Sequence, residues 1–190
     1  MATTFCPAAP DSCRAPFVSG KAQIQLTDKS PDDKDQLAWK WLAGTAMTKL
    51  EFGDPLGADD YGLCLYDASG LRASLLAPAG GTCAGKPCWA DKPTGFAYKD
   101  KDLTPSGLSQ IVLKEGVDGK AQIQVKGKGL NLPMPSLLSV APPLTVQLRN
   151  LTSGLCWGAT YSTPFTLGYA IDMFLSHVTP VSALSSLPNA

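Results

Sequence analysis

The chain has 190 residues with 16 basic and 16 acidic side chains and one histidine, so its formal net charge is zero. A zero net charge argues against a nucleic-acid partner and against electrostatic membrane binding, because both favour a basic protein. The sequence contains no run of about 20 apolar residues that could span a bilayer as a helix. Met1 is not followed by a charged and apolar cleavable leader, so we expect any exported form to be a mature chain.

Glycine and proline are frequent, at 18 and 16 residues, and they separate many short apolar runs. Such punctuation is typical of β-strands joined by turns. We therefore predict an all-β fold, a disulfide-stapled β-sandwich built from two pseudo-repeated halves. The expected boundaries are a Pro/Ala-rich N-terminal arm at 1–19, a sandwich at 20–165 with halves at roughly 20–100 and 108–165, and a low-charge C-terminal strand and tail at 166–190.

Alternation of apolar and polar residues, the period of a strand with one buried face, predicts the individual elements. The expected strands, in chain order, are 21–27, 37–41, 48–52, 61–67, 71–76, 96–99, 108–114, a central strand beginning near Gly119, 144–149 and a long strand at 165–175. Residues 77–95 are predicted to form a stapled loop around Trp89. Gly127 and Gly129 indicate a bulge or a close backbone approach in the central strand.

Two short strings occur twice, which favours duplication of an ancestral half. Gly-Lys-Ala-Gln-Ile-Gln stands at residues 20–25 and again at 119–124, an offset of 99 residues. Gly-Leu-Cys stands at 62–64 and 154–156, an offset of 92 residues. Because order and approximate spacing are kept, we interpret the chain as two related halves.

The number and distribution of cysteines predict disulfides and an oxidising compartment rather than a zinc site, because they are even in number and lack a Cys-x-x-Cys motif. The six residues are Cys6, Cys13, Cys64, Cys83, Cys88 and Cys156. Fifteen pairings are possible. We favour Cys6–Cys13 and Cys83–Cys88 as short loops and Cys64–Cys156 as a staple between the halves. Reduced, buried cysteine is the alternative.

Three segments resemble a family of uncharacterised secreted bacterial proteins: Gly119–Pro135, Cys156–Ser162 and Cys83–Trp89. The resemblance covers roughly residues 20–165. It implies paired β-rich repeats and secretion, and it brings no catalytic residues with it.

No catalytic constellation stands out, so we predict a protein that is not an enzyme and has no cofactor or metal. The only histidine is His177, and no Gly-x-Ser-x-Gly elbow accompanies it. Aspartates gather in turns, where they ordinarily accept backbone hydrogen bonds; paired carboxylates for glycoside hydrolysis or a Ca²⁺ site are the alternatives. These residues are Asp28, Asp32, Asp33, Asp35, Asp54, Asp59 and Asp60.

Two further features concern glycans. The tryptophans Trp39, Trp41, Trp89 and Trp157 could form a sugar-stacking platform, although such residues more often fill a sandwich core. Asn150-Leu151-Thr152 matches the N-glycosylation pattern, which makes Asn150 a glycosylation candidate on an expected exposed turn.

The functional hypothesis is based on the composition of the C-terminal third of the chain. Residues 129–190 contain only Arg149 and Asp172 as charged side chains. Soluble monomers spread charge over their surface, so this segment either supplies covered strands of the sandwich or contacts another copy by strand addition. The candidate assembly residues are Phe165, Leu167, Tyr169, Ile171, Met173 and Leu175. We expect an extracellular or cell-surface structural subunit that self-assembles into a filament or matrix fibre; the alternative is a secreted glycan-binding or adhesin module.

Overall fold

The protein was analysed as a computed structural model, which describes residues 5–162, 166–167 and 171–175. The elements are β1 (Ala22–Asp28), η1 (Asp32–Lys34), β2 (Gln36–Gly44), η2 (Lys49–Phe52), β3 (Tyr61–Asp67), β4 (Gly70–Ala77), β5 (Thr82–Cys83), β6 (Lys86–Pro87), β7 (Trp89–Lys92), β8 (Gly95–Lys99), β9 (Leu108–Lys114), β10 (Ala121–Lys128), η3 (Leu137–Ser139), β11 (Leu144–Asn150), β12 (Cys156–Tyr161), β13 (Thr166–Leu167) and β14 (Ile171–Leu175). The η elements are short 3₁₀-helices.

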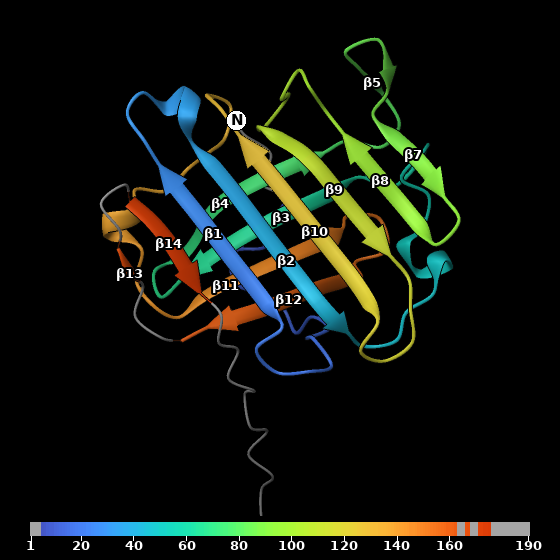
Figure 1. Cartoon of the computed structure of the whole chain (residues 1–190), viewed down its shortest axis with the longest axis horizontal. Coiled ribbons are helices and arrows are strands. Elements are labelled where there is room, and N and C mark those ends of the chain that lie inside the picture. Colours follow the sequence, from blue (N-terminus) through green and yellow to red (C-terminus); the bar gives the residue numbers. More distant parts are fainter. Residues whose placement is uncertain (1–4, 163–165, 168–170, 176–190) are drawn as a thin grey trace, which may run out of the picture.

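The strands form two packed antiparallel sheets, which confirms the prediction of an all-β sandwich. The larger sheet has the order β13-β14-β1-β2-β10-β9-β8-β7, and the smaller has the order β12-β11-β3-β4. Figure 1 shows the larger sheet in front, with the smaller sheet behind it and its strands crossing those in front. Strands β5 and β6 form a separate hairpin at one corner. Among the described residues, no helix is long and apolar enough to cross a membrane.

Alternation along the strands sends one face of each sheet into a shared aromatic core. On β2, Trp39 and Trp41 are fully buried, and Trp39 lies opposite Ile24 of β1 on one side and Val125 of β10 on the other. The indole N–H of Trp39 donates to the Tyr161 hydroxyl at 3.0 Å, which joins the two sheets by a buried hydrogen bond. Burial of large side chains, each contributing about 2–3 kcal/mol, therefore accounts for the close packing of the layers.

The repeated strings lie in corresponding places within each sheet. The two Gly-Lys-Ala-Gln-Ile-Gln strings lead into β1 and β10, and both strands pair with β2. The two Gly-Leu-Cys strings lie at the starts of β3 and β12, and both strands pair with β11. Each sheet thus mixes strands from residues 20–100 and 108–165. Duplication of an ancestral half stays a prediction.

Glycine in β10 allows a close approach that a side chain would prevent. The register between β10 and β9 shifts between Lys126 and Gly127. A Cβ on Gly127 would lie 2.8 Å from Leu132 Cδ1 and 3.2 Å from the Gly107 carbonyl oxygen. The expected bulge or close approach in the central strand is therefore confirmed at Gly127.

The N-terminal segment covers the outer face of the smaller sheet. Cys6 is disulfide-bonded to Cys64 of β3, and Cys13 to Cys156 of β12. Between them, the backbone carbonyl of Asp11 accepts a hydrogen bond from the buried Gln147 side chain at 2.6 Å. The outer face of the smaller sheet is thereby covered, whereas no segment among the described residues covers the outer face of the larger sheet.

The disulfide pairing corrects two of the three favoured bridges. All six cysteines are bonded, and Cys83–Cys88 is confirmed. Cys64 and Cys156 lie on strands that flank β11, which places them two strand spacings, about 10 Å, apart. That separation exceeds the reach of a disulfide, about 7 Å between Cα atoms. Each residue pairs instead with a cysteine of the N-terminal segment, which crosses the sheet as an extended chain rather than folding on itself.

The strand predicted at 48–52 is wrong, because this segment forms the 3₁₀-helix η2. The Glu51 carboxylate accepts the Thr48 backbone N–H at 2.6 Å, the arrangement of a capping box. Leu50, which the alternation placed inward, is 90% exposed. The local capping hydrogen bonds override the two-residue period here.

The long strand predicted at 165–175 is also wrong. β13 and β14 pair antiparallel with each other, Leu167 opposite Met173, so the chain reverses between them. β14 pairs in turn with β1, from Ile24 opposite Leu175 to Asp28 opposite Ile171. The C-terminal hairpin thus completes one edge of the chain's own larger sheet. Phe165 and Tyr169 lie outside the described residues, as does His177.

Candidate binding face

On the open face of the larger sheet, the outward charged side chains of β1, β2 and β7–β10 are all lysines. Strand pairing fixes which side chains point outward from β1, β2 and β7–β10, namely those alternating with the buried ones. We call this surface the lysine face. Its lysines are Lys40, Lys92, Lys99, Lys114, Lys126 and Lys128, and its glutamines are Gln23, Gln25, Gln36, Gln110, Gln122 and Gln124. None of the outward positions on these strands is Asp, Glu or an aromatic residue.

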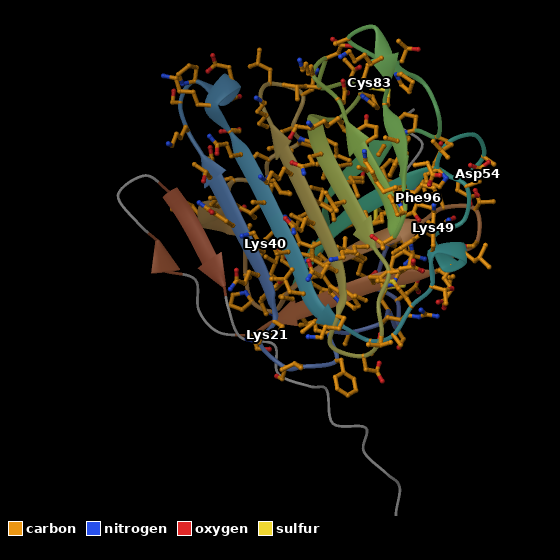
Figure 2. All side chains as sticks on the ribbon, turned by 45° about the vertical axis from the view of Figure 1, so that its right-hand side comes forward. Lys21, Lys40, Lys49, Asp54, Cys83 and Phe96 are labelled. Atoms are coloured by element: carbon orange, nitrogen blue, oxygen red, sulfur yellow. A yellow bond between two sulfur atoms is a disulfide. The ribbon has the colours of Figure 1, made fainter. Side chains whose placement is uncertain are left out.

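The register places these side chains in contact across strands. Lys40 of β2 lies opposite Gln23 of β1 and Gln124 of β10. Gln110 of β9 lies opposite Lys126 on one side and Lys99 on the other. Lysine and glutamine alternate at these positions, and apolar residues such as Ala38 and Val112 occupy neighbouring positions in the same rows. Figure 2 shows Lys40 on this face, away from Lys49 at the sheet's far edge.

The acidic side chains that are closest in sequence to this face are turned away from it. Asp91 of β7 lies opposite the buried Phe96, and its carboxylate pairs with the Lys49 ammonium group. The hydrogen bond from Lys49 lowers the pKa of Asp91, so this carboxylate stays ionised and is neutralised at the sheet edge. The zero net charge of the chain thus conceals a locally basic surface.

Two depressions lie along the lysine face. A groove of about 410 Å³ crosses β1, β2 and β10, and its polar walls include Gln25, Gln36, Lys126 and Lys128. A second depression of about 450 Å³, which we call the hairpin hollow, lies where the β5–β6 hairpin meets β7 and β8. Its charged walls are Lys86, Lys92, Lys99 and Lys101. Neither depression has a carboxylate in its wall.

The tryptophans do not form a sugar-stacking platform. Trp39, Trp41, Trp89 and Trp157 are each at most 1% exposed. Trp157 packs against Tyr61 with ring centroids 6.5 Å apart, and Trp89 packs against Tyr98 at 5.1 Å. The expectation that such residues fill the core is confirmed.

The aspartate-rich turns use their carboxylates to hold backbone. Asp35 accepts the Lys29 N–H, Asp59 the Asp54 N–H and Asp60 the Ala79 N–H, each at 2.7 Å. These contacts confirm the structural interpretation of the turns. Within the described ranges, no group of three or more His, Cys, Asp or Glu side chains is arranged to hold a metal ion.

Glu51 and Glu115 both line a mainly apolar depression of about 520 Å³, and each is engaged in a structural contact. Glu51 pairs with Arg14 at 2.5 Å, and this hydrogen bond lowers the pKa of its carboxyl. Glu115 accepts the Lys49 backbone N–H at 2.8 Å. Both carboxylates are thus held by contacts within the fold.

Asn150 does not lie on an exposed turn, contrary to expectation. It is fully buried and donates its amide N–H to the Phe52 carbonyl at 3.1 Å. Its side-chain oxygen accepts the backbone N–H groups of Thr152 and Ser153 at 3.0 and 2.9 Å. The amide nitrogen that would carry a glycan is thus part of the folded core.

In comparisons with known proteins, no family model, no curated protein and no solved structure matches this chain. The resemblance to a family of secreted bacterial proteins stays an expectation. The lysine face and the disulfides are therefore the features that bear on function.

Proposed function

We propose that this protein is an extracellular binding module that holds an acidic polysaccharide on its lysine face. The observation that carries the proposal is the set of six lysines and six glutamines that point outward from six adjacent strands with no carboxylate among them. Ammonium groups bind carboxylate or sulfate groups, and amides exchange hydrogen bonds with hydroxyls. The alternation of the two along the sheet suits a polymer that alternates charge and hydroxyl.

Two observations favour a glycan over a nucleic acid. Proteins that bind single strands stack bases on aromatic side chains, and the outward rows of β1, β2 and β7–β10 contain none. Three disulfides fit an oxidising compartment outside the cytosol, where acidic polysaccharides are common polyanions. The proposal includes no catalytic step.

The test is retention of the chain by acidic polysaccharides such as heparin, alginate and polygalacturonate, with neutral dextran as reference. We expect binding that weakens as salt rises, because exposed ion pairs are screened. Lys40→Gln with Lys126→Gln should weaken binding about tenfold, since each exposed pair contributes up to about 1 kcal/mol and 1.4 kcal/mol is tenfold.

The matched control is Lys29→Gln with Lys34→Gln, which removes two positive charges from the loop around η1 and spares the lysine face. It should bind as the unaltered chain does. Equal losses in both variants would contradict the assignment of the face. Tighter binding of single-stranded DNA than of any polysaccharide would contradict the choice of ligand class.

Self-assembly is the second candidate, supported by the pairing of β14 with β1. This strand stands near the end of the chain and completes the edge of a sheet. A segment that adds to an edge within one chain can add to the same edge of a second copy, by exchange of the terminal hairpin. Residues Leu167, Ile171, Met173 and Leu175 belong to the exchanged strands.

Light scattering after size-exclusion chromatography tests this candidate. If hairpins are exchanged, the mass of the full chain rises with concentration, and deletion of residues 165–190 abolishes the rise. A full chain that stays monomeric at every concentration would contradict self-assembly and leave the binding module unaffected.

A further inference from the structure

We propose that the hairpin hollow is a discrete subsite for a sulfate or phosphate ester carried on a sugar. The inference rests on the proposed function, because such a sugar would be a unit of the acidic polysaccharide held on the lysine face. The hollow differs from the rest of that face in being walled on one side by the β5–β6 hairpin, and Figure 2 shows Cys83 in this wall.

The hairpin is held firmly enough to serve as a wall. The Cys83–Cys88 disulfide closes it at its base. At its turn, the backbone N–H of Ala84 donates to the Asp102 carboxylate at 2.6 Å. The Cys88 carbonyl accepts the backbone N–H of Lys99 at 2.8 Å, which joins the hairpin to β8. These contacts tie the hairpin to the sheet without using any lysine side chain.

Four lysines from four different segments line the hollow. Lys86 comes from the hairpin, Lys92 from β7, Lys99 from β8 and Lys101 from the loop that follows β8. Within the described part of the chain, none of the four takes part in an ion pair. Asp102 lies at the hairpin turn and Asp91 lies near Lys92, but neither carboxylate lines the hollow. The four like charges therefore repel one another, and a bound anion reduces that repulsion.

Because the cationic side chains of the hollow are lysines, we can infer which shape of anion it fits best. A planar carboxylate is best matched by the flat guanidinium fork of arginine, and no arginine lines the hollow. Ammonium groups are point charges that can approach a tetrahedral oxyanion from several directions. A sulfate or phosphate ester, with three oxygens spread over a tetrahedron, fits four lysines from different segments better than a uronate does.

The remainder of the hollow suits a sugar ring. Its neutral walls include Ala90, Ala97 and Gln110, and a volume of about 450 Å³ lies within the range of small-ligand sites. The Tyr98 side chain turns away from the hollow into the core, where its ring packs against Trp89 and its hydroxyl donates to the Asp100 carboxylate. Asp100 is itself buried and accepts the backbone N–H groups of Asp102 and Thr104. The negative charge of the Asp100 carboxylate is thus stabilised by these backbone N–H donors.

The direct test is nuclear magnetic resonance titration of the ¹⁵N-labelled chain with glucose 6-sulfate, glucose 6-phosphate, glucuronate and glucose. The side-chain amide of Gln110 reports on the hollow, and that of Gln124 reports on the middle of the lysine face. We expect both esters to shift the Gln110 signal, with saturation, before the Gln124 signal moves. Glucuronate should bind more weakly, and glucose should leave both signals unchanged. The relative affinities of sulfate and phosphate identify which ester the site prefers.

Lys86→Gln with Lys101→Gln removes the two lysines of the hollow that lie outside the outward rows of the sheet. This variant should bind glucose 6-sulfate about tenfold more weakly. Lys40→Gln with Lys126→Gln removes the same charge from the middle of the lysine face and should bind the ester as the unaltered chain does. Unchanged binding in the first variant, or equal shifts of Gln110 and Gln124 at every ester concentration, would overturn the proposal.

The proposed function and the proposed subsite would be contradicted by different results. Retention on sulfated polysaccharide that depends on Lys40 and Lys126, with no saturable shift of Gln110 by either ester, overturns the subsite and leaves the proposed function standing. A saturable shift of Gln110 that depends on Lys86 and Lys101, in a chain that no acidic polymer retains, overturns the proposed function and supports the subsite.

Discussion

Replacing Cys13 and Cys156 together by serine is expected to lower the free energy of unfolding by about 5 kcal/mol. Their disulfide closes a loop of 143 residues, and loop-closure entropy in the unfolded chain grows with loop length. The loss also frees the N-terminal segment that covers the smaller sheet, next to the bridge between Arg14 and Trp157. Urea unfolding followed by tryptophan fluorescence measures the change, because all four tryptophans are buried.

Cys83→Ser with Cys88→Ser is the matched control, since it removes one disulfide of the same kind. That bridge spans a separation of only 5 residues, for which the same entropy argument gives about 2 kcal/mol. The hairpin lies at a corner outside the two main sheets. Equal unfolding midpoints for the two double variants would contradict the view that the N-terminal segment is a covalent strap on the sandwich.

Asn150→Ala is expected to lower the free energy of unfolding by about 3 kcal/mol. The side chain makes three hydrogen bonds in a fully buried position, one to the Phe52 carbonyl and two from the N–H groups of Thr152 and Ser153. Truncation leaves these backbone groups without their partner, and each buried unsatisfied group costs about 1–3 kcal/mol, which water entering the cavity partly offsets. The urea midpoint of the purified variant measures the loss.

Thr152→Val provides the comparison, because it abolishes the same glycosylation pattern without altering the Asn150 side chain. Thr152 is exposed, and its hydroxyl donates a long hydrogen bond of 3.4 Å to the Ala58 carbonyl. We expect a change below about 1 kcal/mol. If Thr152→Val were as destabilising as Asn150→Ala, the effect would belong to the turn and not to the buried amide.

Several of the strands that the sequence predicted have the expected bounds. Residues 61–67 and 108–114 are strands with the expected bounds, and Trp39 and Trp41 lie in the core as their spacing indicated. The period of two works at 108–114 and at Trp39 and Trp41 because one face of these strands is buried, whereas the strand at 61–67 is buried on both faces. It fails at 48–52, where Thr48 and Glu51 form a capping box. That signature was visible in the sequence, and it competes with the alternation over a segment of only five residues.

Two of the three disulfides could not be predicted from local features of the sequence. Six paired cysteines followed from their number, but the partners of Cys6 and Cys13 did not. Pairing depends on which strands are neighbours in the smaller sheet, and β11 separates the two strands that carry Cys64 and Cys156. The number of residues between two cysteines does not reveal the order of the strands in the sheet. Asn150 illustrates the same limit, because a short motif does not encode burial.

By itself, the sequence determined the all-β class, the aromatic core positions and the use of cysteine as covalent staple, because periodicity and composition are local properties of the chain. Only the tertiary structure determined which sheet faces are exposed and which charged side chains lie together on them. Lys40, Lys99 and Lys126 are distant in sequence and come together because β2, β8 and β10 belong to one sheet. Net charge averages over the whole surface, whereas binding depends on the charges that strand pairing places side by side.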